Sequence, residues 1–591
     1  MIVPMKKLTL LVSERERENL ISALGKAGVV HIKPVKPPKA HDITFLEDKI
    51  LNLERMMTIL RPYASSGKQQ KKCSAVSILE DAERIEELYR ERRSLKSAID
   101  ELNLKIRWFD RWGRFDPESL SALRGKGVDI RLCRIKKDEF PKLKKLQHKV
   151  LSREKGYFYL AVVLPGGEEL PVQEVIPPPK SVALLKEERG ELGEKMDRID
   201  IFLKEEAEAL DSLKECRQGL EKELKFLNVK FGMKEEEGFA YLQGFSPAAD
   251  LDKVTSVAKE YGAGYLAEEP DNPEETPTLI RTPKWLRIID PVFKFMNTIP
   301  GYEEFDISFY FLVFFSLFFA MLVGDAGYGI LFLVTTFLAR QKFRKVNWEP
   351  FFLMYLLSAA TIVWGVITGT WFGAERIQEV PLLHRLVIPQ INSFSDTNQN
   401  FMIYICFIIG AVQLTIAHTL RALRVINSIK ALAQVGWILV LWGMFFAAGK
   451  FVIARPFPQE AGWLLVAGIV TVLFTSNPGK GILKGALATL AELPLNVISS
   501  FSDIVSYLRL FAVGYAAVVV AQSFNDMALA GGIHGVIGGI AAAAILFFGH
   551  ALNIILAFMA VIVHGIRLNM LEFSGHLGMQ WSGKKYEPYV E

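Results

Sequence analysis

Long apolar runs fill the second half of the chain, and they constrain its fold more than any other feature of the sequence. Residues 1 to about 300 are instead rich in Lys, Arg and Glu. A transmembrane helix needs roughly 20 apolar residues, and in lipid a helix satisfies its own backbone hydrogen bonds. The sequence therefore predicts an all-α transmembrane domain over residues 306–591. Its apolar runs lie at about 307–323, 326–339, 351–372, 401–420, 431–449, 462–475, 493–524 and 536–571.

The first two runs are short, so they form either a hairpin that turns at Gly324-Asp325-Ala326-Gly327 or one kinked helix. The distribution of basic residues favours the hairpin, because cytoplasmic loops carry an excess of Lys and Arg. With the hairpin, eleven basic residues face the cytoplasm: Arg340, Lys342, Arg344, Lys345, Arg421, Arg424, Lys430, Lys480, Lys484, Lys584 and Lys585. Four face outward: Arg376, Arg385, Lys450 and Arg455. The sequence thus predicts eight spans in a multi-pass protein of the cell membrane, with both termini cytoplasmic.

The first half is predicted to be an α+β cytoplasmic domain, residues 1–280, joined to the membrane domain by a linker at 281–305. Strands are expected at 5–12, 28–33, 128–135 and 157–164, with a helix at 14–27 and a basic helix between the last two strands. Apolar residues at alternating spacings of three and four, interrupted by Arg92, are typical of a coiled coil. We expect a proximal lobe (1–40 and 235–270), a coiled coil (42–110 and 183–230) and a distal lobe (115–180).

One long helix out and one long helix back, paired antiparallel, is the simplest arrangement of these segments. It returns the chain to the membrane linker from the same end at which it left. A generic coiled-coil spacer between unrelated lobes explains the heptads equally well, and so does a parallel dimer between chains.

Composition and motifs exclude several function classes. Cys73, Cys133, Cys216 and Cys406 are scattered without pairing logic, which fits a reducing compartment, and no cleavable signal peptide is expected. A net charge of +5 does not call for nucleic acid. The sequence contains no GxxxxGK[ST], HExxH or GxSxG. We therefore expect a non-catalytic chain without a cofactor or bound metal.

Polar residues inside the last two apolar runs are the strongest functional signal. Arg509 lies well inside its run, and Arg567 lies among aliphatic residues with His564 three positions before it. An arginine at the middle of a span costs about 2.5–3.5 kcal/mol, so such residues usually face protein or water. Arg509 would need a matching acid to be purely structural, and Asp503 is one candidate. The structural alternative for Arg567 is that its side chain extends to the cytoplasmic interface, and this alternative weakens if the helix continues to Gly583.

Other polar residues have plain structural interpretations. Gln522 and Asn553 would serve as interhelical hydrogen-bond partners, and His564 as a satisfied core histidine. Asp325 would cap a helix beside the glycines of GDAGYG.

Three motifs together resemble subunit I, the a-type subunit, of V/A-type rotary ATPases. They are GDAGYG at 324–329, SYLRLFAVGYA at 506–516 and VHGIRLNMLEF at 563–573. By this resemblance Arg509 faces a carboxylate of the rotor ring, Arg567 is its companion, His564 precedes that companion, and Asp325 lines the outer half-channel. The chain departs from the eukaryotic pattern at Ala517, Ala557 and Asp503, with Gln522 and Asn553 as substitutes in the channel lining.

The resemblance implies a stator subunit that forms two half-channels against a ring of small membrane subunits, each bearing a carboxylate. It would couple proton or sodium translocation to ATP hydrolysis or synthesis. Its partners would be that ring, the peripheral stalk subunits, the catalytic head through those stalks, and the lipid bilayer. The alternative is a stand-alone secondary transporter or channel with a coiled-coil regulatory domain. That class would show inverted repeats and a complete midplane site, and neither is evident.

Overall fold

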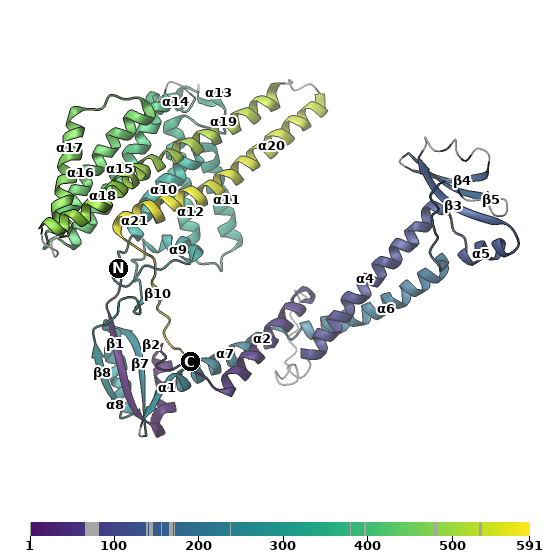
Figure 1. Cartoon of the computed structure of the whole chain (residues 1–591), viewed down its shortest axis with the longest axis horizontal. Coiled ribbons are helices and arrows are strands. Elements are labelled where there is room, and N and C mark those ends of the chain that lie inside the picture. Colours follow the sequence, from purple (N-terminus) through teal and green to yellow (C-terminus); the bar gives the residue numbers. More distant parts are fainter. Residues whose placement is uncertain are drawn as a thin grey trace.

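A helical bundle, a sheet beside it and a long helical arm that ends in a second sheet make up the computed structural model (Figure 1). The structure describes residues 2–590 apart from 65–81, 137–139, 141–142, 144–145, 155, 165–169, 171, 237, 379, 395–397, 478–481 and 531–534. Cys73 and Lys480, which the sequence interpretation used, lie outside the described residues.

The sheet beside the bundle, here called the proximal sheet, joins both ends of the first half of the chain. Its central pair is β1 (Met5–Ser13) and β7 (Phe239–Pro247), which run antiparallel. β2 (His31–Lys33) and β6 (Lys234–Glu236) pair with β7, and β8 (Gly264–Glu268) pairs with β1. Helices α1 (Arg17–Ala27) and α8 (Leu251–Glu260) pack against one another. The strand predicted at 5–12 is confirmed, and its apolar side chains Leu8, Leu10 and Val12 are buried.

The arm is made of two helix pairs. α2 (His41–Leu60) packs on α7 (Leu210–Gly232), and α4 (Ala82–Trp112) packs on α6 (Val182–Ala207). One buried cluster along the arm holds residues of both predicted heptad segments: Leu53, Leu60, Ile85, Ile199, Leu203, Leu210 and Leu213. The prediction of one long returning helix is wrong in detail. The helix breaks at Glu208 and Ala209, where backbone N–H groups bond three residues back rather than four.

Arg92, the charged exception in the predicted heptads, has a partner across the arm. Its Nε donates to Asp200 Oδ1 at 2.5 Å and its Nη2 to Asp200 Oδ2 at 3.3 Å. The guanidinium also lies over the Tyr63 ring, 5.6 Å from the centroid. A two-point ion pair therefore replaces an apolar contact at this level of the arm.

The distal sheet has three strands, in the order β3 (Asp129–Lys136), β5 (Tyr157–Leu164), β4 (Gln147–Glu154), beside α5 (Pro117–Gly125). The basic helix predicted between the outer two is wrong for residues 147–154, which form β4. Burial alternates along β4 with period two, because one face of the strand packs on the sheet while its basic residues point outward. Lysine content alone had suggested a helix.

The second half is helical. The main helices are α10 (Ser308–Val323), α11 (Ala326–Lys342), α12 (Glu349–Thr368), α15 (Gln399–Arg424), α16 (Lys430–Ile453), α17 (Gln459–Thr475), α18 (Ile482–Ser506), α19 (Leu508–Ala530) and α20 (Gly535–Ala560). Short helices α13 (Glu375–Gln378) and α14 (Pro381–His384) connect α12 to α15. Among the described residues, five helical stretches are long and apolar enough to cross a membrane. α10 and α11 form a further apolar pair bent by 118°, and α17 is a shorter apolar helix.

The final helix does not stay α-helical. After α20, residues Val561–Gly565 and Leu568–Phe573 form two π-helical turns, followed by α21 (Ser574–Leu577). Gly578 then ends the helix with φ of 76°, a left-handed conformation that glycine adopts without strain. The helix therefore does not continue to Gly583, the condition under which the sequence would place Arg567 as deep as Arg509.

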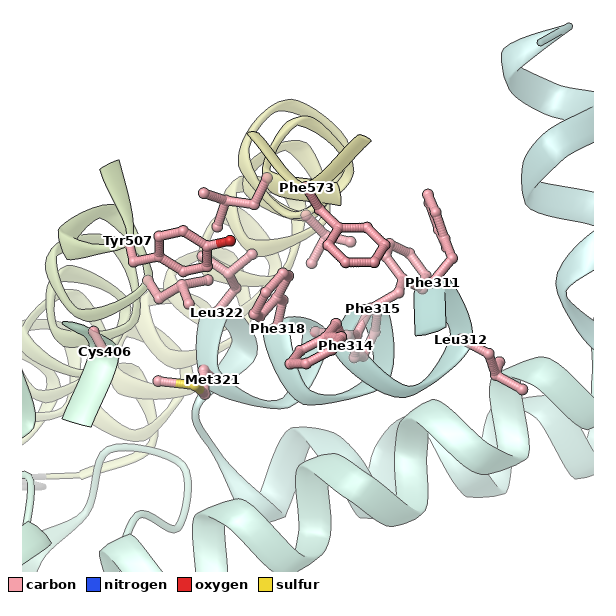
Figure 2. Packing of buried hydrophobic residues seen from close by; sticks show 14 of the residues in the cluster. Phe311, Leu312, Phe314, Phe315, Phe318, Met321, Leu322, Cys406, Tyr507 and Phe573 are labelled. Carbon is pink, nitrogen blue, oxygen red and sulfur yellow. The ribbon is translucent and has the colours of Figure 1, made fainter. Parts of the chain in front are cut away.

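Helix α10 forms the centre of the bundle. Its side chains Phe311, Phe314, Phe315 and Phe318 gather around Phe573 of the last helix and Tyr507 between α18 and α19 (Figure 2). This packing fixes the two helices that bear the arginines against a common support.

The chain end returns from the bundle to the proximal sheet. β10 (Lys584–Lys585) pairs parallel with β9 (Pro277–Thr278), and α9 (Asp290–Met296) lies in the linker. Tyr589 N donates to Val30 O at 2.8 Å, and the Tyr589 side chain, 7% exposed, joins the core of the sheet. The C-terminal tail thus ties the bundle to the first half of the chain, a contact that the sequence did not predict.

Candidate ion-translocation site

The guanidinium of Arg509 holds a carboxylate of its own chain. Nη2 donates to Glu572 Oε1 at 2.5 Å, while Nε donates to the carbonyl oxygen of Ser506 at 2.9 Å. The Glu572 side chain is 5% exposed and that of Arg509 is 23% exposed. The second bond exists because the helix is interrupted at Tyr507, which leaves the Ser506 carbonyl free to accept from a side chain.

Arg567 approaches the same carboxylate from within the last helix. Its Nε lies 3.8 Å from Glu572 Oε1, and its side chain is 56% exposed. The two residues are five apart, a spacing that places side chains on different faces of an α-helix. Because a π-helix repeats from i to i+5, the turn at Leu568–Phe573 brings them to one side. Two cations therefore share one acid.

A buried hydrogen-bonded chain fixes the backbone around this ion pair. Tyr507 Oη donates to Gln413 Oε1 at 2.8 Å, and Gln413 Nε2 donates to Asn569 Oδ1 at 2.9 Å. All three side chains are fully buried. They link α15, the break before α19 and the second π-helical turn. The backbone that carries Arg509 and Glu572 is therefore held by side chains whose hydrogen bonds are formed.

Glu572 of the ion pair lines a cavity of about 660 Å³. The lining includes three carboxylates, and we call this cavity the polar cavity. The polar residues that line it are His418, Arg421, Lys430, Gln434, Ser476, Asn477, Thr489, Glu492, Asn496, Ser499, Ser500, Asp503, Glu572 and His576. Such a lining can hold water and ions beside Glu572.

Asp503, which the sequence offered as a partner of Arg509, is bound elsewhere. His576 Nε2 lies 3.0 Å from Asp503 Oδ2, and His576 Nδ1 lies 2.9 Å from His418 Nε2. His418 Nδ1 in turn contacts Gln434 Oε1 at 2.9 Å. Asp503, the candidate acid for Arg509, does not pair with it, because Glu572 occupies that position. Asp503 instead contacts His576, at the end of a chain of histidine side chains in the lining of the polar cavity.

Asp325 caps α11 and anchors the loop that follows α12. Its Oδ1 accepts from the backbone N–H groups of Gly327, Tyr328 and Phe372, and its Oδ2 from Gly373, at 2.8–3.2 Å. The residue is 2% exposed. Four backbone donors occupy this carboxylate, which is the arrangement of a structural cap.

A polar cluster lies next to this cap, between α11, α19 and α20. Asn553 Nδ2 donates to Tyr328 Oη at 3.1 Å and to Ala517 O at 2.9 Å. Tyr328 Oη lies 2.7 Å from His550 Nδ1, and His550 Nε2 lies 3.1 Å from Asn525 Oδ1. The sequence singled out only Asn553 for this position. The sequence around Tyr328 and His550 shows only that both residues lie in apolar runs, and it does not predict their contact.

The remaining predicted residues are less engaged. His564 Nδ1 is buried and has no hydrogen-bond partner among the described residues. Gln522 is half-buried on α19. The structure thus brings Arg509 and Arg567 together, adds Glu572, and leaves Asp325, Asn553 and Gln522 away from the ion pair.

Similarity to known proteins agrees with these observations. No protein-family model matches the chain. V-type ATP synthase subunit I of Borreliella burgdorferi is 30% identical over 619 residues, covering 100% of this chain and 99% of that protein. V-type ATP synthase subunit I 1 of Treponema pallidum is 28% identical and covers 100% of both chains. A-type ATP synthase subunit I of Methanocaldococcus jannaschii is 26% identical and covers 68% of this chain and 64% of that protein.

One solved structure is the cytoplasmic N-terminal domain of subunit I, a homolog of subunit a of V-ATPase. It is 19% identical, with a TM-score of 0.23, and covers 44% of this chain and 99% of that one. From the full-length identity of 30% to the Borreliella protein, the chain belongs to the subunit I family of V-type ATP synthases.

Proposed function

We propose that the chain is the membrane stator of a rotary ATPase and that Arg509 attracts the carboxylate of each passing ring subunit. The observation that supports this proposal is the ion pair itself, in which Arg509 already holds an acid that lines the polar cavity. Arginine stays protonated at any physiological pH, so it can favour the anionic form of a carboxylate without carrying a proton. A ring carboxylate would replace Glu572 at Arg509.

The polar cavity supports the role of one half-channel, which delivers ions to or from the ring at Glu572. The cluster around Tyr328, His550 and Asn553 marks where the outer half-channel would start, with Asp325 as the cap that shapes it. His564, Arg567 and Gln522 would border the contact with the ring. Moving one charge across 100 mV is worth about 2.3 kcal/mol, so several protons or sodium ions must pass for each ATP.

The first half of the chain is proposed to be the attachment for peripheral stalks. Residues 1–280 would form a cytoplasmic domain with a proximal lobe, a coiled coil and a distal lobe, 281–305 the linker, and 306–591 the translocating domain. The long arm, braced by the pair of Arg92 and Asp200, supports this assignment because a sheet at each end offers two separated attachment points (Figure 1). The chain itself would not hydrolyse ATP; the catalytic head would do so.

Eight spans with both termini in the cytoplasm are proposed for the membrane domain. The 118° bend between α10 and α11 supports the hairpin at Gly324. Single cysteines in a cysteine-free chain test it: those at Asn347 and Ser476 should react with an impermeant thiol reagent added to the cytoplasmic side, and one at Asp526 only from outside. Outside labelling at Asn347 would mean that α10 and α11 act as one broken span.

Replacement of Arg509 tests the function directly. Arg509→Ala and Arg509→Lys should abolish ATP-driven ion uptake into vesicles while the complex still assembles. Lysine should fail because a desolvated ammonium loses its proton and lacks the planar fork. Arg340→Ala, at the exposed end of α11, is the matched control and should pump normally. Normal pumping by Arg509→Ala would end the proposal.

A further inference from the structure

A second cavity, of about 590 Å³, lies where the linker, the start of α10 and the C-terminal tail meet. We call it the junction cavity. Its aromatic lining comes from Phe293 and Phe305 of the linker and from Trp581 and Tyr586 of the tail. Ligand pockets commonly measure about 300–1,000 Å³ and are mostly apolar with a few polar groups, and the junction cavity has these properties. It shares no residue with the polar cavity.

Two threonines of the lining carry hydroxyls without a partner. Thr278 Oγ1 and Thr298 Oγ1 are buried and make no hydrogen bond within the described part of the chain. Thr278 as a whole is 4% exposed. A buried hydroxyl left unpaired costs about 1–3 kcal/mol, so most such groups in folded proteins have a partner. Both hydroxyls are therefore available to hydrogen-bond with a polar group of a ligand.

Exposed aromatic residues flank the junction cavity. Trp285, Phe295 and Phe309, which flank the cavity along the chain, are 59%, 71% and 46% exposed. Exposed aromatic residues at the end of a span are typical of the headgroup region of a bilayer. They would be costly to expose to water and need lipid beside them.

The charged residues of the lining have both signs. Lys294 and Asp290 lie one turn apart on α9 and both line the cavity. Lys294 is exposed and Asp290 half-buried, and burial raises the pKa of the Asp290 carboxyl above its ordinary value. The other two are engaged, because Lys585 pairs with Glu587 at 2.9 Å and Asp306 accepts from Ser308 Oγ at 2.6 Å. Neither Lys294 nor Asp290 forms a salt bridge with any other residue in the described part of the chain, although the charges of Lys294 and Arg287 act on Asp290, and a cation beside an acid suits a zwitterionic ligand.

We propose that the junction cavity binds one phospholipid of the surrounding bilayer, with a zwitterionic headgroup that carries an amine. The phosphate lies at Lys294 and the threonine hydroxyls, the amine lies at Asp290, and the start of an acyl chain covers Phe293 and Phe305. The lipid then bridges the linker and the C-terminal tail. This site is independent of ion translocation at Arg509, so either proposal can fail alone.

Lipid retention in the intact complex tests the site. Complexes are purified in mild detergent from membranes, their lipids are extracted, and phosphatidylethanolamine is counted per complex by mass spectrometry. The double variant Thr278→Val/Thr298→Val and the variant Lys294→Ala should each retain about 10-fold less of the tightly held lipid, since each loses one or two hydrogen bonds. Lys284→Ala removes an exposed lysine of the same linker outside the lining and should match the wild type.

The thermal stability of the double variant Thr278→Val/Thr298→Val also distinguishes a cavity that binds lipid from an empty cavity. In an empty cavity, removing two unpaired buried hydroxyls is neutral or stabilising, so the thermal midpoint of the complex would stay or rise and lipid content would not change. That result overturns the proposal. In the lipid site, the midpoint falls in the variant, and adding vesicles with phosphatidylethanolamine raises the midpoint of the wild type more than that of the variant. An equal rise with vesicles of pure phosphatidylglycerol would overturn the zwitterionic headgroup.

Discussion

Glu572→Gln in the isolated chain leaves two arginines without their shared acid, and its cost can be worked from the geometry. Removing one partner of a buried ion pair costs about 3–5 kcal/mol, because the other charge stays buried and unpaired. Glu572 is 5% exposed, but Arg509 is 23% exposed and can regain some water. We therefore expect a loss of about 2–3 kcal/mol, which corresponds to a fall of about 4–6 °C in the unfolding midpoint of the membrane domain.

A double-mutant cycle shows whether this loss of stability comes from the interaction between Arg509 and Glu572. Arg509→Ala, Glu572→Gln and the double variant are compared by thermal unfolding of the detergent-solubilised chain, without ring subunits. The losses of stability in the two single variants should add up to more than the loss in the double variant, with a coupling energy of about 2 kcal/mol. Arg567, which is 56% exposed and lies 3.8 Å from the acid, is the matched comparison and should couple to Glu572 by less than about 1 kcal/mol.

Additive effects of Arg509→Ala and Glu572→Gln, within about 0.5 kcal/mol, would refute the ion pair as drawn here. Repeating the cycle in the assembled complex adds a functional reading. If a ring carboxylate replaces Glu572 at Arg509, the coupling between these two residues should shrink when the ring is present. An unchanged coupling would mean that Arg509 never leaves Glu572, and that it does not serve the ring.

Three further predictions concern other parts of the chain. Asp325→Asn should destabilise the membrane domain by about 2–3 kcal/mol, because an amide cannot accept four backbone N–H bonds; a stable variant that no longer transports would instead make Asp325 part of the outer path. Arg92→Ala should lower the stability of the arm by about 1 kcal/mol, measured by thermal unfolding, with exposed Arg93→Ala unchanged. Acidification should release the C-terminal tail from His31, measured by proteolysis of the tail.

The sign of this pH effect follows from the burial of His31 in the docked state, where its Nδ1 lies 3.0 Å from Glu587 O and 3.1 Å from Glu587 N. Burial lowers the pKa of the imidazole, and the nearby charge of Lys584 lowers it further. The hydrogen bond to Glu587 and the charge of its carboxylate raise the pKa but do not cancel this effect. The ring of Tyr586 also lies against the imidazole. A lowered pKa in the docked state means that docking favours the neutral imidazole. This stabilisation is complete above the ordinary pKa of about 6.5 and is lost as the pH falls through the lowered value. A tail equally protected at pH 5 and pH 8 would contradict this account.

The residues of the candidate site could be predicted from the sequence only where the chain keeps the regular spacing of an α-helix. Arg509 and Arg567 were found because a cation inside an apolar run is conspicuous at any helix geometry. Glu572 was missed because a spacing of five from Arg567 points to another face of an α-helix, and nothing in the sequence announced two π-helical turns. Asp503 was named as a candidate acid from its position alone, because the sequence does not show that Asp503 contacts His576.

In the first half, patterns with a strong period were predicted well and contacts between distant segments were not. Strands β1 and β5 and the heptad segments follow from alternation and from spacings of three and four. Strand β4 was missed, because its lysines and arginines face outward and conceal a period of two. The contact of Tyr589 with Val30 joins residues from opposite ends of the chain, and no local pattern reports such a contact.

The last helix and the C-terminal tail together explain how a stator of this kind resists rotation. Under the proposed function, a ring that turns past Arg509 would pull on Glu572 and Arg567, and therefore on the last helix. That helix continues through Gly578 into β10 and Tyr589, which are fixed to strand β9, just before the linker, and to the proximal sheet. The first half is thus attached to the bundle twice, by the linker and by the tail. One attachment would let the arm pivot about a point, whereas two attachments oppose the torque along an axis.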